Sequence, residues 1–178
     1  TTHRARELES VIDRSETDTE PVAVARLVAD TCESLVEEYP HAEINCAVDK
    51  SAVGVAGPAL REAVVELIEN AVEHTTAEPT VDVRVACRPE TDSVVITVAD
   101  DGPGIPDDER AVVDGDRSIT PLDHGSGLGL WLAKWVLEAY GGELAFAGPD
   151  SALGGAAVEL RIRQTTESPS TDQPLTTD

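Results

Sequence analysis

The sequence predicts an α+β fold, a two-layer α/β sandwich in which three helices cover one face of a mixed, mostly antiparallel sheet. Two patterns lead to this prediction. Apolar residues recur with a helical period in three long segments, and short runs rich in Val, Ile and Thr lie between these segments, mostly in pairs. A length of 178 residues is typical of one domain with a sizeable buried core.

The first part of the chain contains two helical patterns of unequal strength. Residues 4–14 have apolar positions at helical spacing, but this segment is too short and too charged to fold alone, so we expect it to need a partner helix. After a polar break, residues 22–39 form a longer amphipathic pattern. Pro21 is expected in the first turn of this helix, where its fixed backbone angle is tolerated.

The next elements are two strands and a helix. Short strands are expected at residues 43–48 and 52–56, on either side of the turn residues 49–51. Pro58 begins a second helix, which has an uninterrupted apolar face. This face consists of Leu60, Ala63, Val64, Leu67, Ile68, Ala71 and Val72.

A strand pair is expected at residues 80–87 and 93–99, joined through "RPETD" and followed by the turn-rich "DDGPGIP". Residues 107–125 contain a short helical pattern and a long loop, and loops of this length are usually functional or disordered. A third helix is expected over 126–140, followed by closing strands in "GGELAFAG" and "AAVELRIR". From Gln164 the chain is a polar tail with too little apolar surface to fold.

The charge balance excludes some classes of partner. The chain has 35 Asp and Glu against 13 Lys and Arg, a net charge of −22. Such a surface repels phosphate backbones and anionic lipids, so neither nucleic acid nor a membrane surface is expected as a direct partner. Because the acids are spread through segments with apolar periodicity, we interpret them as a halophilic, salt-adapted surface on which concentrated cations screen the repulsion.

The three cysteines indicate a reducing compartment. Cys32, Cys46 and Cys87 are isolated, odd in number and set among apolar residues, so they are expected to be small buried hydrophobes in a reducing cytoplasm, without metal-ligand spacing. There is no apolar run of membrane length and no signal peptide.

The first residue also bears on how much of the protein is present. Because the chain starts without Met, we expect it to be a fragment of a longer protein.

The stretch "DHGSGLGLWLAK" has glycines at 125, 127 and 129. It has neither the spacing of a dinucleotide-binding fingerprint nor the spacing and lysine of a P-loop. Closely spaced glycines at the start of a helix nevertheless let backbone N–H groups approach an anion. The alternative is a flexible helix entry capped by Ser126, and the stretch alone does not decide between them.

Two further groups of polar residues stand beside the predicted core. One stripe on the second helix consists of Glu66, Asn70, Glu73 and His74. The amide oxygen of Asn70 suits Mg²⁺, and a carboxylate one turn away can orient a nucleophile. The alternative is an ordinary solvent-exposed stripe without a binding role. Asp100 ends a strand that is expected to be buried, where an adenine amino group could satisfy the carboxylate. The alternative for "DDG" is a hairpin turn.

Together these stretches resemble the catalytic ATP-binding domain of sensor histidine kinases, in the superfamily of gyrase B, Hsp90 and MutL with its Bergerat-type fold. "ELIENAVEHT" resembles the N box, "DDGPGIP" the G1 box and "GSGLGL" the G2 box. The resemblance covers about residues 22–163. It divides the chain into the end of a dimerisation helix with its linker (1–20), the catalytic domain (21–164) and a disordered acidic tail (165–178).

The resemblance implies a role for each matching residue. Asn70 would hold Mg²⁺ between the ATP phosphates, and Glu66 would act beside it as the second catalytic residue, at the position that is the general base in related ATPases. His74 would lie beside the adenine and Asp100 would accept a hydrogen bond from its amino group. Two sets of residues complete the implied ATP site. Gly102, Gly104 and Ile105 would shape the adenine pocket, and Gly125, Ser126, Gly127, Leu128 and Gly129 would form the hinge of an ATP lid at 107–125.

Two departures concern the phosphate contacts. Glu73 stands where the family usually has Lys or Arg, and no F box with its Phe is present. Arg117 is therefore the best candidate for the missing phosphate contact, and Lys134 is the second. His3 does not match the phosphoacceptor position, because it stands near the end of the second helix of the dimerisation pair.

The resemblance implies a MgATP-dependent protein-histidine kinase. The acceptor histidine would lie on a dimerisation domain largely outside this chain, a response-regulator receiver domain would take the phosphoryl group, and the full-length protein would be a homodimer. The alternatives are an ATP-sensing interaction module and an anti-sigma-type serine kinase of the same fold. An ATPase clamp would need a further domain that this length does not hold.

Overall fold

The computed structural model describes residues 19–73, 78–102, 127–146 and 157–169. Within these ranges, secondary structure follows in this order: β1 (Glu20–Ala23), α2 (Val24–Glu38), β2 (Glu43–Val48), β3 (Val53–Ala56), α3 (Ala59–Glu73), β4 (Thr80–Arg88), the short 3₁₀ helix η1 (Pro89–Thr91), β5 (Ser93–Asp100), α5 (Gly127–Ala139), β6 (Glu143–Phe146) and β7 (Ala157–Arg163).

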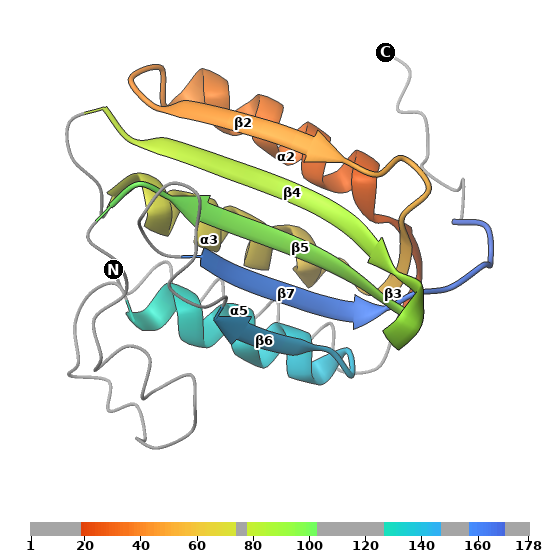
Figure 1. Cartoon of the computed structure of the whole chain (residues 1–178). Coiled ribbons are helices and arrows are strands. Elements are labelled where there is room, and N and C mark those ends of the chain that lie inside the picture. The colour runs from red at the N-terminus through yellow and green to blue at the C-terminus, as the bar shows by residue number, and fades with distance from the viewer. Residues whose placement is uncertain (1–18, 74–77, 103–126, 147–156, 170–178) are drawn as a thin grey trace, which may run out of the picture.

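The predicted fold class is confirmed. Five strands form a sheet in the order β2-β4-β5-β7-β6, in which β2 and β4 are parallel and every other pair is antiparallel. Helices α2, α3 and α5 cover one face of this sheet (Figure 1). None of the helices in the described ranges is both long and apolar enough to cross a membrane.

The core lies between the helices and the sheet. Alternate residues of the central strands point toward the helices, so that Val83 of β4 and Ile96 of β5 are fully buried. The predicted apolar face of α3 is buried over its whole length. Fully burying each Val, Leu or Ile side chain contributes about 1.5–3 kcal/mol, so this layer supplies most of the driving force for folding.

The start of the domain differs from the prediction. Pro21 does not begin a helix, because residues 20–23 form strand β1, which pairs antiparallel with β3 and leaves α2 to begin at Val24. A proline is tolerated in a two-stranded sheet because its missing N–H can face away from the partner strand. The strands β2 and β3 flank a turn as predicted, but they belong to different sheets.

The folded domain continues past Gln164, where the composition predicts the start of an unfolded tail. Gln164 donates its N–H to the Asp92 carbonyl (2.8 Å) and forms a bridge with Gly54, while Thr165 donates its N–H to the Val53 carbonyl (3.0 Å). The predicted tail is therefore ordered in its first residues. Backbone hydrogen bonds to β3 hold a segment whose side chains are polar.

Tyr140 connects the end of α5 to the beginning of α3. Its hydroxyl oxygen accepts a hydrogen bond from the Ala59 N–H at 3.1 Å, and the side chain is only 6% exposed. The ring lies so close to Gly57 that a Cβ there would stand 2.6 Å from the hydroxyl oxygen. The bond satisfies one of the backbone donors that every helix leaves open in its first turn.

We expect Tyr140→Phe to lower the free energy of unfolding by about 1–2 kcal/mol, because it leaves the buried Ala59 N–H without its acceptor. Denaturant unfolding at constant salt measures this. Tyr39→Phe is the matched control, since the Tyr39 hydroxyl bonds to Glu69 at a half-buried position. A loss for Tyr140→Phe no greater than for Tyr39→Phe would contradict the assignment.

Candidate functional site

Three elements meet at one end of the sandwich. The end of α3, the end of β5 and the beginning of α5 all lie at the left of the view in Figure 1. The helices α3 and α5 pack against each other and run in opposite directions. This arrangement brings the three groups of polar and glycine residues predicted from the sequence to the same end of the molecule.

The polar stripe on α3 lies at the margin of the core. Glu66 and Asn70 are half-buried beside the buried apolar face, while Glu73 in the last turn is exposed. An amide and a carboxylate one turn apart at a partly desolvated position can bind a hard cation or orient a polar ligand.

Glu69, which the sequence reasoning did not single out, lies beside this stripe. The Tyr39 hydroxyl, just after α2, donates a hydrogen bond to a Glu69 carboxylate oxygen at 3.0 Å. Burial, and then the bond to Glu69, raise the pKa of Tyr39 to about 12. The contact attaches α2 to the half of α3 that carries Asn70.

Asp100 is the buried carboxylate of the site. Among the described residues, only Thr31 and Asp100 are buried side chains of polar or charged type. Asp100 is the last residue of β5, in register with Val81 of β4, and its Oδ1 accepts the Gly102 N–H at 2.9 Å. This local turn fixes the carboxylate at the end of the strand.

The hairpin interpretation of "DDG" does not fit the sheet order. A tight hairpin after Gly102 would put a new strand beside β5, but both neighbouring positions are taken by β4 and β7. The turn therefore ends a central strand, at the end of the sandwich where α5 begins.

The adjacent aspartate has a different role, which the sequence reasoning missed. Asp101 is exposed, and its Oδ1 accepts the Thr80 N–H at 3.1 Å, at the first residue of β4. Asp100 is the last residue of β5 and Asp101 is the first residue after it, so one carboxylate is buried and the other is exposed. The doublet at the end of a predicted strand was the signal available in the sequence.

Two of the three glycines of the predicted hinge lie in the described part of the chain. Gly127, Leu128 and Gly129 form the first turn of α5, close to the start predicted at Ser126. The positive end of the helix dipole therefore points toward the site. Lys134 lies further along α5 and pairs with Glu138 at 3.8 Å, in the direction away from this end.

Several predicted site residues lie outside the described residues. They are His74, Gly104, Ile105, Arg117, Gly125 and Ser126, together with the whole of the predicted lid at 107–125 and with His3.

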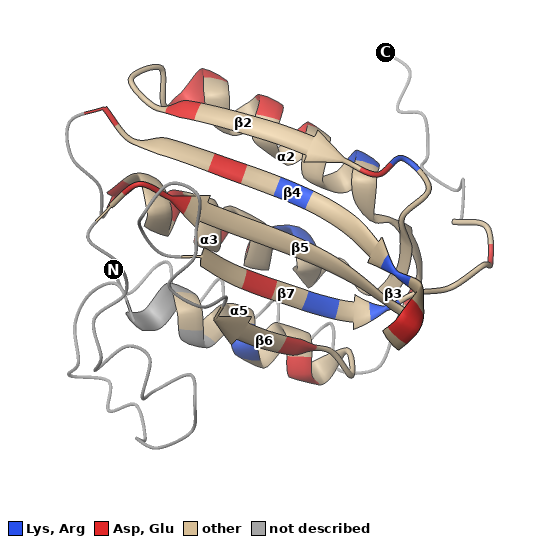
Figure 2. Cartoon of the chain, viewed as in Figure 1, with Lys and Arg blue, Asp and Glu red and all other residues tan. Residues whose placement is uncertain are grey.

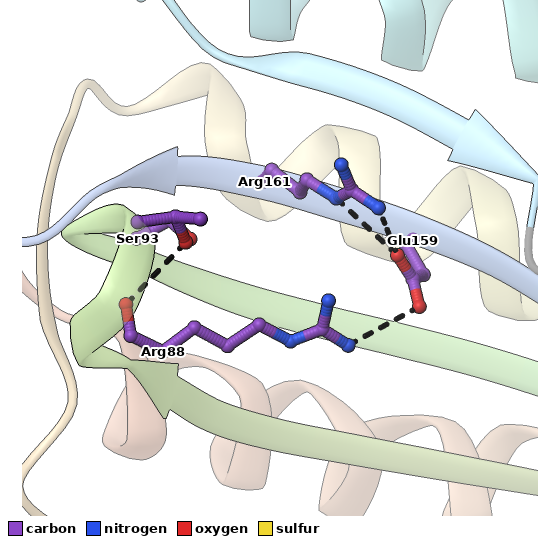
Figure 3. Close-up of polar contacts among 5 residues, drawn as sticks. Arg88, Ser93, Glu159 and Arg161 are labelled. Carbon is purple, nitrogen blue, oxygen red and sulfur yellow. Dashed lines mark hydrogen bonds and ion pairs between the residues drawn. The ribbon is translucent and has the colours of Figure 1, made fainter.

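Two of the described arginines form ion pairs on the face of the sheet that the helices do not cover. Glu159 of β7 accepts hydrogen bonds from Arg161 (2.8 Å) and from Arg88 of β4 (3.4 Å), as Figure 3 shows. Figure 2 shows acidic and basic residues following one another along both β4 and β7. These two arginines are therefore not available to the site.

Comparison with known proteins identifies the family of the chain. The sequence profile described as histidine kinase-, DNA gyrase B- and HSP90-like ATPase matches residues 56–166. The chain is 34% identical over 141 residues to the two-component sensor PhoQ of Pseudomonas aeruginosa, covering 78% of this chain and 31% of PhoQ. It is 34% identical over 145 residues to the sensor-type histidine kinase PrrB of Mycobacterium leprae, covering 80% and 31%. The chain thus spans about a third of these relatives.

Solved structures show the same architecture. The ATP-binding domain of PrrB from Mycobacterium tuberculosis matches with a TM-score of 0.67 at 28% identity, over 84% of this chain and all of that domain. Full-length ShkA in complex with AMPPNP matches with a TM-score of 0.66 at 25% identity, over 85% of this chain and 32% of ShkA.

The Tyr39–Glu69 contact can be tested by titration. We expect Tyr39 to ionise with a pKa of about 12 instead of 10.0, and Glu69→Gln to lower this pKa, because it removes the carboxylate that opposes the phenolate. Since the folded pKa is the raised one, the stabilisation from Tyr39 is present below pH 10 and is lost between pH 10 and 12. Tyrosinate absorbance, assigned by comparison with Tyr39→Phe, measures the shift. An equal pKa in the Glu69→Gln variant would contradict the contact.

Proposed function

The chain belongs to the family of histidine kinase-, DNA gyrase B- and HSP90-like ATPases, and we propose that it is the MgATP-binding catalytic domain of a two-component sensor histidine kinase. One observation carries the proposal: the buried carboxylate of Asp100 ends a central strand at the end of the molecule that also holds Asn70 and the first turn of α5. The similarity to PhoQ and PrrB over most of this chain supports the same assignment.

Asp100 provides adenine recognition in this proposal. With Oδ1 held by the Gly102 N–H, the carboxylate accepts a hydrogen bond from the exocyclic amino group of adenine. Guanine presents a carbonyl oxygen at the equivalent position, which a carboxylate repels, so the site selects ATP over GTP. The proposal assigns Gly102, Gly104 and Ile105 to the adenine pocket and His74 to a contact with the adenine ring.

Asn70 and Glu66 act near the phosphates of ATP in this proposal. A half-buried amide oxygen fits Mg²⁺, because it is a hard ligand that adds no negative charge to a chain that is already acidic. Mg²⁺, when bound, neutralises phosphate charge. Glu66, one turn earlier on α3, orients the attacking histidine, and the work of the protein is mainly positioning and charge neutralisation.

The start of α5 and the preceding segment complete the phosphate site. Backbone N–H groups of Gly127 and Gly129 and the positive helix end attract the phosphates, and Gly125, Ser126 and Leu128 act with them as the hinge of a lid at 107–125. Arg117 supplies the phosphate contact that Glu73 does not. With Glu66, Glu69 and Glu73 on one half of α3, binding is expected to require Mg²⁺ and high salt, in keeping with a salt-adapted protein.

The phosphoryl acceptor and the partners lie outside the chain in this proposal. The γ-phosphoryl group passes to a histidine on a dimerisation domain, whose end with its linker corresponds to residues 1–20, and then to an aspartate on a response-regulator receiver domain. Residues 21–164, extended by the pairing of Thr165, form the catalytic domain of a cytoplasmic homodimer. The binding of AMPPNP by the structural neighbour ShkA supports nucleotide binding here.

The kinase assignment is tested on the longer parent protein, incubated with Mg²⁺ and γ-labelled ATP in molar KCl. We expect protein-bound label that is labile in acid and stable in alkali, as phosphohistidine is. Absence of label despite tight ATP binding would overturn the kinase assignment. That outcome would favour an ATP-sensing interaction module, which the exposed Glu73 in place of a basic residue already suggests as the second candidate.

The nucleotide site is tested by three variants of this chain. We expect Asp100→Asn to weaken ATP binding roughly 10- to 100-fold, because a charged hydrogen bond is lost, and to reduce discrimination against GTP. Asn70→Ala should chiefly remove the Mg²⁺ dependence of binding. Titration calorimetry with ATP and GTP, with and without Mg²⁺, measures both effects.

Asp101→Asn is the matched control for this experiment. It changes a neighbouring carboxylate that bonds to Thr80, so its nucleotide affinity should equal that of the unmodified chain. Unchanged affinity in both Asp100→Asn and Asn70→Ala would mean that the nucleotide site lies elsewhere.

A further inference from the structure

The face of the sheet that the helices leave uncovered has an ordered distribution of charge. Alternation assigns side chains to this face, because Val83 of β4 and Leu160 of β7 belong to the core on the other face. None of the α-helices in the described ranges lies over it (Figure 1). We call it the open face. Its charged residues on β4 and β7 are Asp82, Arg84, Arg88, Glu159, Arg161 and Arg163.

Both charged strands change from acidic to basic in the same direction. β4 and β7 are each antiparallel to β5, so they run parallel to each other. The acid comes first in both strands, at Asp82 and at Glu159, and the arginines follow, as Figure 2 shows. Glu143 of β6 departs from this division, because it lies in register with Arg161. The open face therefore has an acidic end beside Asp100 and a basic end beside η1.

The strand between the two charged strands carries no charge on the open face. The residues of β5 on this face are Ser93, Val95, Thr97 and Ala99. Val95 is only 2% exposed although it lies outside the core cluster, so its neighbours on the open face already cover it. Because β5 has no long side chain on this face, a second sheet can approach it to the usual spacing of about 10 Å.

The basic end keeps unpaired positive charge. Glu159 accepts hydrogen bonds from Arg161 at 2.8 Å and from Arg88 at 3.4 Å, and thereby holds both guanidinium groups over the sheet (Figure 3). Arg84 and Arg163 are exposed and form no ion pair within the described part of the chain. The chain as a whole has a net charge of −22, so this end differs in sign from most of the surface.

The edge strand β2 extends the acidic end. The Asn45 side chain donates hydrogen bonds to an Asp82 carboxylate oxygen at 3.1 Å and to a Glu43 carboxylate oxygen at 3.3 Å, so it holds two acids on the open face. The edge position also explains an exposed thiol. Cys32 on α2 is buried as predicted, but the prediction is wrong for Cys46, which is exposed on β2, a strand paired only with β4.

We propose that the open face is a docking surface for a second copy of this chain, with the two sheets packed face to face around a two-fold axis. The axis lies between the sheets and at right angles to the strands. It reverses the strand direction, so the acidic end of each copy faces the basic end of the other. A uniformly acidic or uniformly basic partner would match only one end of the face.

The register of the strands fixes which charges meet. The axis passes over the midpoint of the four open-face residues of β5. Measured along the strands, Arg88 and Asp82 are equally far from this midpoint, and so are Arg161 and Glu159. Arg88 of one copy therefore lies opposite Asp82 of the other, and Arg161 lies opposite Glu159. The two-fold symmetry repeats each contact.

The size of the face predicts a weak dimer. Strands lie about 4.8 Å apart and rise about 3.4 Å per residue, so five strands, with nine residues in β4 and eight in β5, give a face of about 500 Å² per copy. A total of about 1,000 Å² is at the low end for a specific interface. Pairing is therefore expected only at high protein concentration.

Salt decides between attraction and repulsion. Two chains with a net charge of −22 each repel at low ionic strength. At about 1 M salt the Debye length is about 3 Å, so distant charges are screened, whereas side chains in contact keep part of their attraction. We therefore expect the dimer in concentrated KCl.

The test is sedimentation equilibrium of the 178-residue chain in about 1 M KCl, with protein at about 0.01–1 mM. We expect a monomer–dimer equilibrium. Arg88→Asp and Asp82→Arg each place like charges opposite each other, and each should weaken self-association at least about tenfold. An equimolar mixture of these two variants should form a heterodimer, because their charge changes are complementary.

Arg26→Asp is the matched control. It makes the same charge change at an exposed residue of α2, on the helix side of the sandwich, so self-association should be unchanged. A chain that stays monomeric at all concentrations, a dimer insensitive to both reversals, or variants that fail to associate when mixed would each overturn the proposal.

Backbone NMR of the unmodified chain gives a second measurement that does not depend on variants. Raising the protein concentration in the same buffer should shift the amide signals of β4, β5 and β7. Shifts centred instead on α2, α3 or α5 would show that the copies associate through another surface, and would contradict docking on the open face.

Discussion

The arrangement of the site depends on the contact between α3 and α5. Tyr140 fixes the end of α5 to the beginning of α3 through the Ala59 N–H and by close packing on Gly57. With 15 and 13 residues, the two helices are about 22 and 20 Å long, so fixing them together at one end brings Asn70 and the first turn of α5 together at the other. The buried hydrogen bond between Ala59 and Tyr140 thereby helps to position Asn70 and the first turn of α5, which lie at the other end of the helix pair.

The sheet supplies the third part of the site. β5 lies between β4 and β7, with its last residue, Asp100, buried and held by the Gly102 N–H. Asp101 serves the fold by accepting the Thr80 N–H that begins β4. A buried carboxylate is costly unless polar groups or a ligand satisfy it. In the proposed function, its position at the end of a central strand serves recognition of adenine as well as stability.

Charge imposes the main restriction on phosphate binding. The chain carries a net charge of −22, Arg88 and Arg161 are bound to Glu159 on the far face of the sheet, and Lys134 is paired with Glu138. In the proposed function, attraction for phosphate consequently comes from the start of α5, from a bound cation and from Arg117. Such a site should be more sensitive to cations than one built around lysines.

The sequence by itself determined the features that arise from short-range pattern. The period of α3, the strands around "RPETD", the burial of Asp100 and the position of Asn70 at the core margin all follow from residues close together in the chain. The stretches around Asn70, Asp100 and Gly127 also indicated the family, because their order and residue types are local properties. The three-dimensional relation of these stretches was implied by the family resemblance and not by any one of them.

Only the tertiary structure decided the pairings between distant segments. Pro21 lies in a strand because β3 is available beside it, β2 pairs in parallel with β4 and not with its neighbour β3, and Thr165 is held by Val53. Each of these outcomes is a competition among partners for backbone hydrogen bonds and buried surface, which periodicity along the chain does not resolve.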